Sequence, residues 1–470
     1  MMPRPRQRRP PHPRPTASRL PLWTLAVLLA AAALSWPSTA TADISSEIGA
    51  ILAQQQIDAS ATGIFVWDLD AARPVYTWND DEEFAPASNM KLVTSAAALM
   101  NWGADHRLAT ELYLQDVRIT DGVLPGDLYL RGLGDPSLST RDYQRQDLGF
   151  STASLEAFAR GLRARGVHAI SGRVLGDESW FDDERTVSTW KPGLETQSGP
   201  LSALSGNGGV HDNERVDSPA AYSAQLLTTA LREAGITIEG RPGTGEAPAE
   251  ARLLQQQSSA PLRVLLRHMN KESDNLFAEV LLKGLGRDFK DMGATSVGTL
   301  LSAATLASVG APDYTYVVQD GSGLSYGNRL TPHIIVQLLG AMRQRPDFDV
   351  FYDSLAIAGK DGTLAERMRG TAAAENARAK TGTLNVATGL SGYVTSANDH
   401  LVAFSILMAG DPIDWVHSTG AQDKIVAALA ETRLPGKRQL RVTPRLRQSV
   451  ASSVTAGHTA GRALQPGVQP

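Results

Sequence analysis

The stretch APASNMKLVTSAAALM, residues 85–100, decides how the rest of the sequence is interpreted. From Leu92 onward almost every side chain is apolar, so the segment predicts a helix that is buried on all sides. Pro86 sets the direction of the chain at the start, and Ser88 lies in the first turn, where backbone N–H groups lack partners within the helix. Lys91 follows about one turn later and lies on the same face as Ser88.

The pair formed by Ser88 and Lys91 has two interpretations. A lysine among apolar neighbours loses its proton more easily, because desolvation disfavours the charged form, and it can then act as a base for an adjacent hydroxyl. The alternative is a serine that caps the helix beside a solvated lysine. The same spacing recurs at Ser188 and Lys191, but Pro192 favours extended backbone before it. We expect no helix there, so the pattern needs support from other segments.

Length, composition and charge restrict the class of protein. The chain has 470 residues, 42% hydrophobic and 20% charged, which is typical of a soluble globular protein with room for more than one domain. Six arginines lie in residues 1–42 and six lysines or arginines in residues 435–470, with no acid in either segment. Removing these charges from the total of −4 leaves −16 for residues 43–434. An acidic body argues against nucleic acid as a partner, and the absence of cysteine excludes thiol catalysis and disulfides.

The N-terminal segment has the features of a secretory signal peptide. A basic, proline-rich stretch is followed by an apolar stretch and by Ala40-Thr41-Ala42, so we expect cleavage after Ala42 and an exported protein. An uncleaved membrane anchor is the alternative. No other segment is apolar over a sufficient length, so we expect no stable membrane span. Residues 435–470 are basic and lack periodicity, and we expect them to be disordered.

The pattern along the chain predicts an antiparallel sheet packed against helices and interrupted by an insertion. The insertion, residues 105–260, mixes short strands with amphipathic helices. Helical runs follow it, and three consecutive strands and a closing helix end the fold. The predicted strands of the main sheet are 62–70, 74–79, 377–384, 388–396 and 400–410, and the predicted helices around it are 85–100, two runs beginning at 262 and 276, and 414–431.

Ser273-Asp274-Asn275 lies between the two helical runs. Residues two apart do not share a helix face, so a joint role for Ser273 and Asn275 requires this tripeptide to be a turn between helices. Their hydroxyl and carboxamide can then project into a cleft. The alternative is ordinary capping of a helix by these side chains.

Lys380-Thr381-Gly382-Thr383 lies on a predicted strand. Gly382 has no Cβ and lets another backbone come close. Such a strand can pair with a substrate peptide while Lys380 and Thr381 meet its carboxylate. The alternative is an edge strand whose charge prevents aggregation.

The chain order S-x-x-K, S-D-N and K-T-G resembles the signature of the penicillin-recognising serine enzymes. The 185-residue separation of Ser88 and Ser273 requires a domain between them. Together with DGSGLSYGNRLT, GKDGTLAERM and KTGTLNVATGLSGYV, it is similar to the D-alanyl-D-alanine carboxypeptidase/endopeptidase family of low-molecular-mass (class C) penicillin-binding proteins, peptidase family S13. The likeness covers nearly all of residues 50–432.

This resemblance implies an α/β (α+β) architecture, the transpeptidase fold of penicillin-binding proteins and serine β-lactamases. The antiparallel sheet flanked by helices would form a penicillin-binding domain from residues 43–104 and 261–434. An inserted α+β domain would occupy residues 105–260, which is shorter than the two-part insertion of relatives.

The resemblance also implies catalytic roles. Ser88 would be the acylated nucleophile and Lys91 its proton acceptor. Ser273 would shuttle a proton, and Asn275 would hold the substrate amide. The backbone N–H groups of Ser88 and Thr383 would form the oxyanion hole.

Further roles concern substrate binding. Lys380 and Thr381, with Gly382 and Thr383 on the same strand, would bind the terminal carboxylate. Asp177 resembles a family aspartate that reaches from the insertion towards the amine end of the substrate. The alternative is a turn residue, with two other aspartates close by in the sequence.

The implied function is a serine-type D-Ala-D-Ala carboxypeptidase acting on peptidoglycan stem peptides, with D-Ala–meso-diaminopimelate endopeptidase action by the same chemistry. β-Lactams would acylate Ser88, and the enzyme would reside in the periplasm or cell envelope. No metal or other cofactor is expected, since the histidines include no H-E-x-x-H motif. The alternatives are a serine β-lactamase or esterase, and a non-catalytic protein that binds peptidoglycan or senses β-lactams. The sequence indicates no oligomeric state.

Overall fold

The computed structural model describes residues 39–115 and 118–436. Most of the predicted signal peptide, up to residue 38, and the predicted disordered tail from residue 437 lie outside the described residues. The predicted cleavage position after Ala42 falls within α2 (Thr39–Gln54). None of the helices in the described ranges combines the length and apolar character needed to cross a bilayer.

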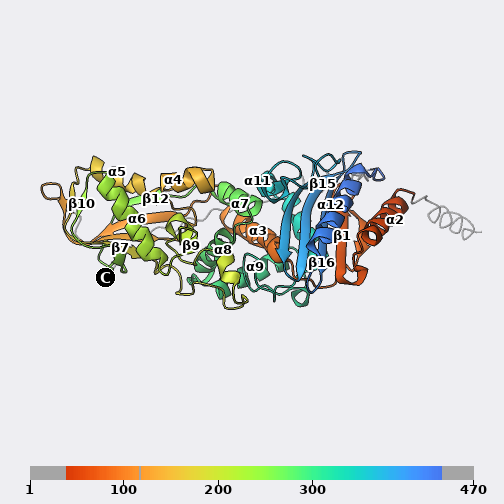
Figure 1. Cartoon of the computed structure of the whole chain (residues 1–470), viewed down its shortest axis with the longest axis horizontal. Helices are drawn as coiled ribbons and strands as arrows, with labels where there is room; N and C mark the ends of the chain where they lie inside the picture. The colour runs from red at the N-terminus through yellow and green to blue at the C-terminus, as the bar shows by residue number, and fades with distance from the viewer. Residues whose placement is uncertain (1–38, 116–117, 437–470) are drawn as a thin grey trace, which may run out of the picture.

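The main sheet has six strands in the order β13-β14-β15-β16-β1-β2 (Figure 1). All of its neighbouring strands are antiparallel, and β1 near the N-terminus pairs with β16 near the C-terminus. The predicted strands are confirmed, and β13 adds a short one. The bounds are β1 Thr62–Asp68, β2 Arg73–Trp78, β13 Ala356–Ile357, β14 Arg378–Leu384, β15 Ala387–Thr395 and β16 Leu401–Ala409.

Both faces of this sheet are covered. Side chains alternate along a strand, so Ile64 and Val66 pack towards α2 and α12 (Trp415–Glu431), whereas Phe65 between them packs on the opposite side. α10 (Pro332–Arg343) lies on that opposite side against β1 and β16. Burial on both faces explains why the three consecutive C-terminal strands are largely apolar rather than alternating.

A layer of helices carries the motif segments to the sheet. α3 (Met90–Trp102) is buried from Met90 to Leu99, which confirms the predicted buried helix. Ser88 lies just before it, in the single 3-10 turn η2 (Ala87–Asn89). The other helices of this layer are α7 Leu262–Lys271, α8 Asn275–Lys290, α9 Thr295–Ser308 and α11 Phe348–Ser354.

Residues between α3 and α7 form three further sheets, at the left of Figure 1, and the two larger ones share a hydrophobic core of their own. The smallest is the two-stranded sheet of β8 and β9. A five-stranded sheet has the order β11-β7-β5-β3-β12, and a three-stranded sheet has the order β10-β6-β4. Ser154 and Ser218 cap α5 and α6 by accepting hydrogen bonds from Ala157 N and Ala221 N.

The strands of this part are β3 Ala109–Leu114, β4 Val123–Leu124, β5 Leu128–Gly132, β6 Ala169–Ile170, β7 Val174–Asp177, β8 Val210–His211, β9 Glu214–Arg215, β10 Thr237–Ile238, β11 Gly243–Thr244 and β12 Arg252–Ser258. Its helices and helical turns are α4 Arg141–Tyr143, η3 Gln144–Leu148, α5 Leu155–Ala164, η4 Leu194–Gln197, η5 Gly206–Gly209 and α6 Pro219–Glu233. Single turns elsewhere are η1 Ala59–Ala61, η6 Asp313–Thr315 and η7 Gly362–Leu364.

Gly323 fixes how the loop of residues 320–325 packs against η2. Its φ is +89°, and a Cβ at this position would overlap the Ala87 carbonyl and lie 3.0 Å from Ser88 N. Gly126 has a similar φ of +76°, but no heavy atom lies within 4 Å of a Cβ built there. Comparing alanine substitutions at Gly323 and Gly126 therefore separates the cost of backbone strain from the cost of steric overlap.

We expect Gly323→Ala to destabilise the protein more than Gly126→Ala. Both substitutions bear the cost of a left-handed residue, about 1–2 kcal/mol, and only Gly323→Ala adds overpacking, about 1–3 kcal/mol. Urea unfolding of each variant measures the difference in free energy of unfolding. Equal losses in the two variants would show that close packing at Gly323 is unimportant.

Candidate active site

Three separate segments of the chain meet at one cavity of about 660 Å³. η2 contributes Ser88, and the turn between α7 and α8 contributes Ser273 and Asn275. β14 contributes Thr381, Gly382 and Thr383. All six of these residues line the cavity. The predicted motifs are therefore brought together, although 185 residues separate the first serine from the second.

Lys91 is fully buried next to the cavity and uses all three of its N–H donors. Its Nζ donates to Ser88 Oγ at 3.1 Å, to Asn275 Oδ1 at 2.6 Å and to the carbonyl oxygen of Ser322 at 2.8 Å. Burial lowers the pKa of Lys91 to about 8, while the negative charges of Glu279 and other acids oppose the shift. The alternative of a solvated lysine is wrong, and the geometry is that of a base beside a hydroxyl.

Lys380 is the second buried ammonium at the site. Its Nζ donates to Ser273 Oγ at 2.9 Å and to the carbonyl oxygen of Thr381 at 2.9 Å. Burial lowers the pKa of Lys380 well below its usual value, and the positive charge of Lys91 lowers it further. An anion bound beside Lys380 would favour its charged form.

The turn between α7 and α8 frees two polar side chains for the cavity. Ser273 has a φ of +59°, and Asp274 caps α8 by accepting a hydrogen bond from Phe277 N at 3.0 Å. Because Asp274 caps α8, the side chains of Ser273 and Asn275 are not needed for capping. The predicted turn between the two helices is confirmed. Asn275 Nδ2 donates to the carbonyl oxygen of Gln197 at 2.7 Å.

β14 approaches η2 closely at Gly382. A Cβ at Gly382 would lie 2.7 Å from Asn89 Nδ2 and 2.8 Å from the Pro86 carbonyl oxygen. Glycine therefore lets the strand and the turn that holds Ser88 lie side by side. The ladder between β13 and β14 involves only Arg378 and Ala379, which leaves this edge of the strand open further along.

Glu279 and the loop of residues 320–325 support the site, although the sequence motifs predict no role for them. Glu279 is fully buried and accepts hydrogen bonds from Gly321 N at 3.1 Å and Ser322 N at 2.8 Å. These bonds place the Ser322 carbonyl oxygen against Lys91. Burial and the negative charge of Asp320 together raise the pKa of Glu279 to about 8, while the hydrogen bonds from Ser322 and Gly321 oppose the shift. The signal in the sequence was a single acid in the otherwise apolar run LFAEVLL.

Asp177 does not line the cavity. It ends β7, is buried, and accepts hydrogen bonds from Ser179 N at 2.9 Å and Ala247 N at 3.0 Å. Its Oδ2 lies 3.6 Å from Arg131 Nε. This environment is that of the turn residue considered as the alternative, so the predicted contact with substrate gains no support from the geometry.

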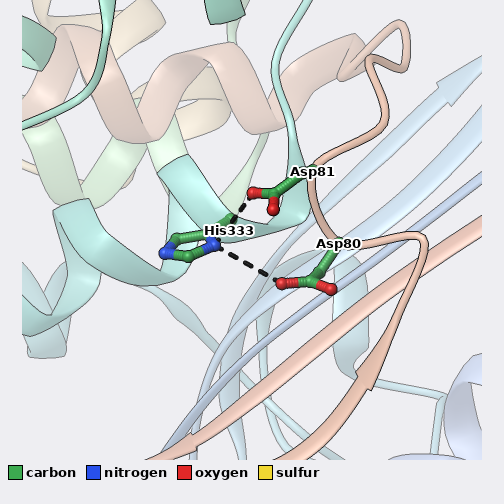
Figure 2. Close-up of side chains that lie close together, drawn as sticks. All are labelled: Asp80, Asp81 and His333. Atoms are coloured by element: carbon green, nitrogen blue, oxygen red, sulfur yellow. Dashed lines mark ion pairs between the residues drawn. The ribbon is translucent and has the colours of Figure 1, made fainter.

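A cluster that resembles a metal site lies elsewhere (Figure 2). His333 Nδ1 lies 3.4 Å from Asp80 Oδ2 and 3.0 Å from Asp81 Oδ1. It is the one such group of three within residues 39–115 and 118–436. The His333 ring stacks on Phe65 with centroids 4.7 Å apart. The cluster shares no residue with the cavity lined by the three motifs.

Comparisons with known proteins agree with this geometry. The model of the D-Ala-D-Ala carboxypeptidase 3 (S13) family matches residues 44–212 and 203–432. A D-alanyl-D-alanine carboxypeptidase of Actinomadura sp. (strain R39) is 32% identical, covering 88% of this chain and 89% of its own. Carboxypeptidase DacB of Mycolicibacterium smegmatis is 30% identical over 80% of this chain and 81% of its own.

Solved structures support the predicted fold class. Penicillin binding protein 4 (dacB) from Haemophilus influenzae has a TM-score of 0.68 at 22% identity, covering 80% of this chain and 98% of its own. The same protein complexed with a β-lactam has a TM-score of 0.63 at 22% identity, covering 80% and 97%. The transpeptidase fold expected from the sequence is therefore confirmed.

Replacing Glu279 separates its role as an acceptor from its charge. We expect Glu279→Ala to lower the free energy of unfolding by about 2–6 kcal/mol, because two buried N–H groups lose their acceptor at about 1–3 kcal/mol each. Glu279→Gln keeps an acceptor oxygen and should cost much less. Chemical denaturation measures both variants, and equal losses would contradict the acceptor role.

Proposed function

The chain belongs to the D-Ala-D-Ala carboxypeptidase 3 (S13) family, and on that premise we propose how it acts: it removes the terminal D-alanine of peptidoglycan stem peptides through an acyl-enzyme on Ser88. The observation that carries the proposal is the 3.1 Å hydrogen bond from Lys91 Nζ to Ser88 Oγ at the edge of a cavity lined by the other two motifs. The enzyme is a serine-type carboxypeptidase that is acylated by β-lactams.

Acylation begins with transfer of the Ser88 proton. A Lys91 pKa of about 8 leaves about a tenth of the enzyme with a neutral lysine at pH 7. Neutral Lys91 accepts the proton as Ser88 Oγ attacks the carbonyl carbon of the penultimate D-alanine. The N–H groups of Ser88 and Thr383 stabilise the negative charge on the carbonyl oxygen.

Proton transfer to the leaving group completes the first half of the reaction. Ser273 is hydrogen-bonded to Lys380 and lines the cavity, a position that supports its role in passing a proton to the amine of the departing D-alanine. The C–N bond of the peptide breaks and the acyl group stays on Ser88. Water then hydrolyses the ester and regenerates the hydroxyl.

Substrate binding uses the open edge of β14. Pairing of the substrate backbone with this edge would bring its terminal carboxylate to Lys380 and Thr381. Asn275 would hold the substrate amide, and its Nδ2 already donates to a backbone carbonyl, that of Gln197, at 2.7 Å. A carbonyl of the substrate could therefore replace that of Gln197 as the acceptor for the same Nδ2 donor of Asn275.

Other parts of the proposal concern location and organisation. Residues 43–104 and 261–434 would form the peptidase domain and residues 105–260 the inserted domain. The protein would be exported and act in the cell envelope. If the leaving amine belongs to a cross-bridge, the same steps give endopeptidase action on a D-Ala–meso-diaminopimelate bond.

Covalent labelling tests the nucleophile. Incubation with a fluorescent penicillin should add the mass of one penicillin to the intact protein, on the peptide that contains Ser88. Ser88→Ala removes the attacking oxygen and should abolish the adduct. The matched control is Ser188→Ala, which alters the other serine with the S-x-x-K spacing and should leave labelling intact. An adduct on another residue would contradict the assignment.

Product analysis separates the alternative functions. D-Alanine release from a pentapeptide that ends in D-Ala-D-Ala is expected of the carboxypeptidase. Rapid turnover of a β-lactam without D-alanine release would instead favour a β-lactamase or esterase. If the protein only binds peptidoglycan or senses β-lactams, its Ser88→Ala variant should retain the cellular function.

The pKa of Lys91 predicts a pH dependence. Because the neutral lysine is the base and its pKa is about 8, the second-order rate constant of acylation should rise about tenfold per pH unit up to about pH 7 and level off above pH 8. Penicillin is a suitable probe, because its carboxylate keeps one charge across this range. Stopped-flow measurement between pH 5.5 and 9 gives the profile, and a flat profile would exclude Lys91 as the titrating base.

A further inference from the structure

The three side chains of Figure 2 come from two elements that are far apart in the sequence. Asp80 and Asp81 lie in the loop that follows β2, and His333 is the second residue of α10. Figure 2 shows both carboxylates beside the imidazole ring, with one nitrogen of the ring facing them. His333 follows Asp81 by 252 residues, so no short motif in the sequence indicates that the three residues share a site.

The donor atoms of the cluster have the spacing of ligands to one ion. His333 Nδ1 lies 3.4 Å from Asp80 Oδ2 and 3.0 Å from Asp81 Oδ1, and the three donor atoms all lie within 4.8 Å of one another. Two ligands that are each about 2.1 Å from a tetrahedral Zn²⁺ lie about 3.4 Å from each other. The observed separations are therefore close to those of a metal site.

The Nδ1 atom of His333 faces this group without a hydrogen bond. It is buried, and none of the described residues accepts from it or donates to it with hydrogen-bond geometry, although two carboxylates are near. The ring stacks on Phe65 with centroids 4.7 Å apart, which fixes its orientation. A cation bound by the lone pair of a neutral imidazole would give this nitrogen its partner.

An ion can reach the cluster from the side of Asp81. The Asp81 side chain is 83% exposed, so it can turn away to admit an ion and return as a ligand. A cavity of about 420 Å³ is lined by Asp81 and His333 and has room for water. Three protein ligands leave a coordination position that such a water can fill.

The backbone around the cluster is held by hydrogen bonds of its own. Asn79, which precedes the two acids, donates through Nδ2 to the carbonyl oxygens of Ala59 at 3.1 Å and Thr62 at 2.9 Å. His333 N donates to the Asp80 carbonyl oxygen at 3.0 Å. The loop and the first turn of α10 are thus in place before an ion binds, which lowers the cost of binding.

The two elements that the cluster joins continue to the active site. Next to the cluster they pair through Phe84 and Leu330, whose N–H groups donate to each other's carbonyl oxygens at 2.9 and 3.0 Å. The first segment reaches Ser88 four residues after Phe84. The second segment contains Ser322, the carbonyl of which accepts a hydrogen bond from the catalytic lysine.

We propose that Asp80, Asp81 and His333 bind one divalent transition-metal ion of the Zn²⁺ class, which ties the loop before the nucleophile to α10. One imidazole and two carboxylates suit Zn²⁺, whereas Mg²⁺ and Ca²⁺ prefer sites built from oxygen alone. The two carboxylates offset the charge of the ion. The ion stabilises the fold and takes no part in acyl transfer, so the inference does not rest on the proposed peptidase function.

Calorimetric titration tests the site. The untagged full-length protein, freed of metal with EDTA and dialysed, should bind one equivalent of ZnCl₂. Asp81→Asn changes an exposed side chain and should weaken zinc binding at least about tenfold, since loss of even an outer partner of a metal ligand costs about 10–100-fold. His333→Gln should weaken it as much. The matched control is His417→Gln, because His417 Nδ1 lies 2.7 Å from a single carboxylate, that of Asp414, and this variant should bind zinc as the wild type does.

Thermal unfolding tests the role of the ion. Because the site requires the loop and the helix together, zinc should raise the Tm of the wild type as its concentration rises, and it should raise that of Asp81→Asn far less. MgCl₂ at the same concentrations should have little effect. Failure of the wild type to bind one equivalent, or wild-type affinity in both Asp81→Asn and His333→Gln, would overturn the site. Zinc binding without a rise in Tm would overturn the proposed tie.

Discussion

The burial of the Lys91 ammonium is the constraint on which the rest of the site depends. A buried charge without partners costs several kcal/mol, and each partner of Lys91 comes from a different segment. Ser88 precedes α3, Asn275 begins α8, and Ser322 lies in the loop of residues 320–325. The ammonium is satisfied only when all three segments are packed together. The hydrogen bonds that stabilise the buried Lys91 therefore also place the nucleophile Ser88 beside its base.

The residues between α3 and α7 are attached to this centre by polar contacts as well as by hydrophobic packing. Trp190 Nε1 donates to Asp320 Oδ2 at 2.9 Å, and the Gln197 carbonyl accepts from Asn275 at 2.7 Å. Asp320 in turn accepts hydrogen bonds within its own loop, from Gly323 N at 2.8 Å and from Ser325 N at 2.6 Å. The loop that supports Lys91 is therefore held by both parts of the chain. Residues between α3 and α7, among them Tyr143 and Gln197, line one side of the cavity, so this part of the chain belongs to the site.

Sequence patterns predicted what depends on local structure. The apolar run after Ser88 is enough to predict a buried helix, and the three C-terminal strands follow from consecutive apolar segments between turns. Glu279 was missed because its role arises from packing: it meets the loop of residues 320–325 only when segments apart in the chain come together. Asp177 is the opposite case, because a motif resemblance suggested a contact with substrate, whereas its buried carboxylate at the end of β7 accepts hydrogen bonds from backbone N–H groups.

The two buried lysines couple substrate binding to the charge of the site. Burial lowers the pKa of Lys380, and the positive charge of Lys91 lowers it further. In the proposed mechanism, a terminal carboxylate beside Lys380 favours its charged form. The carboxylate and the ammonium that it stabilises carry opposite charges, so their effects on the proton of Lys91 oppose each other. Binding of the anion through Lys380 therefore positions the peptide without adding net charge beside the base, whereas an anion that bound without Lys380 would hold the proton on Lys91 and remove the base that Ser88 needs.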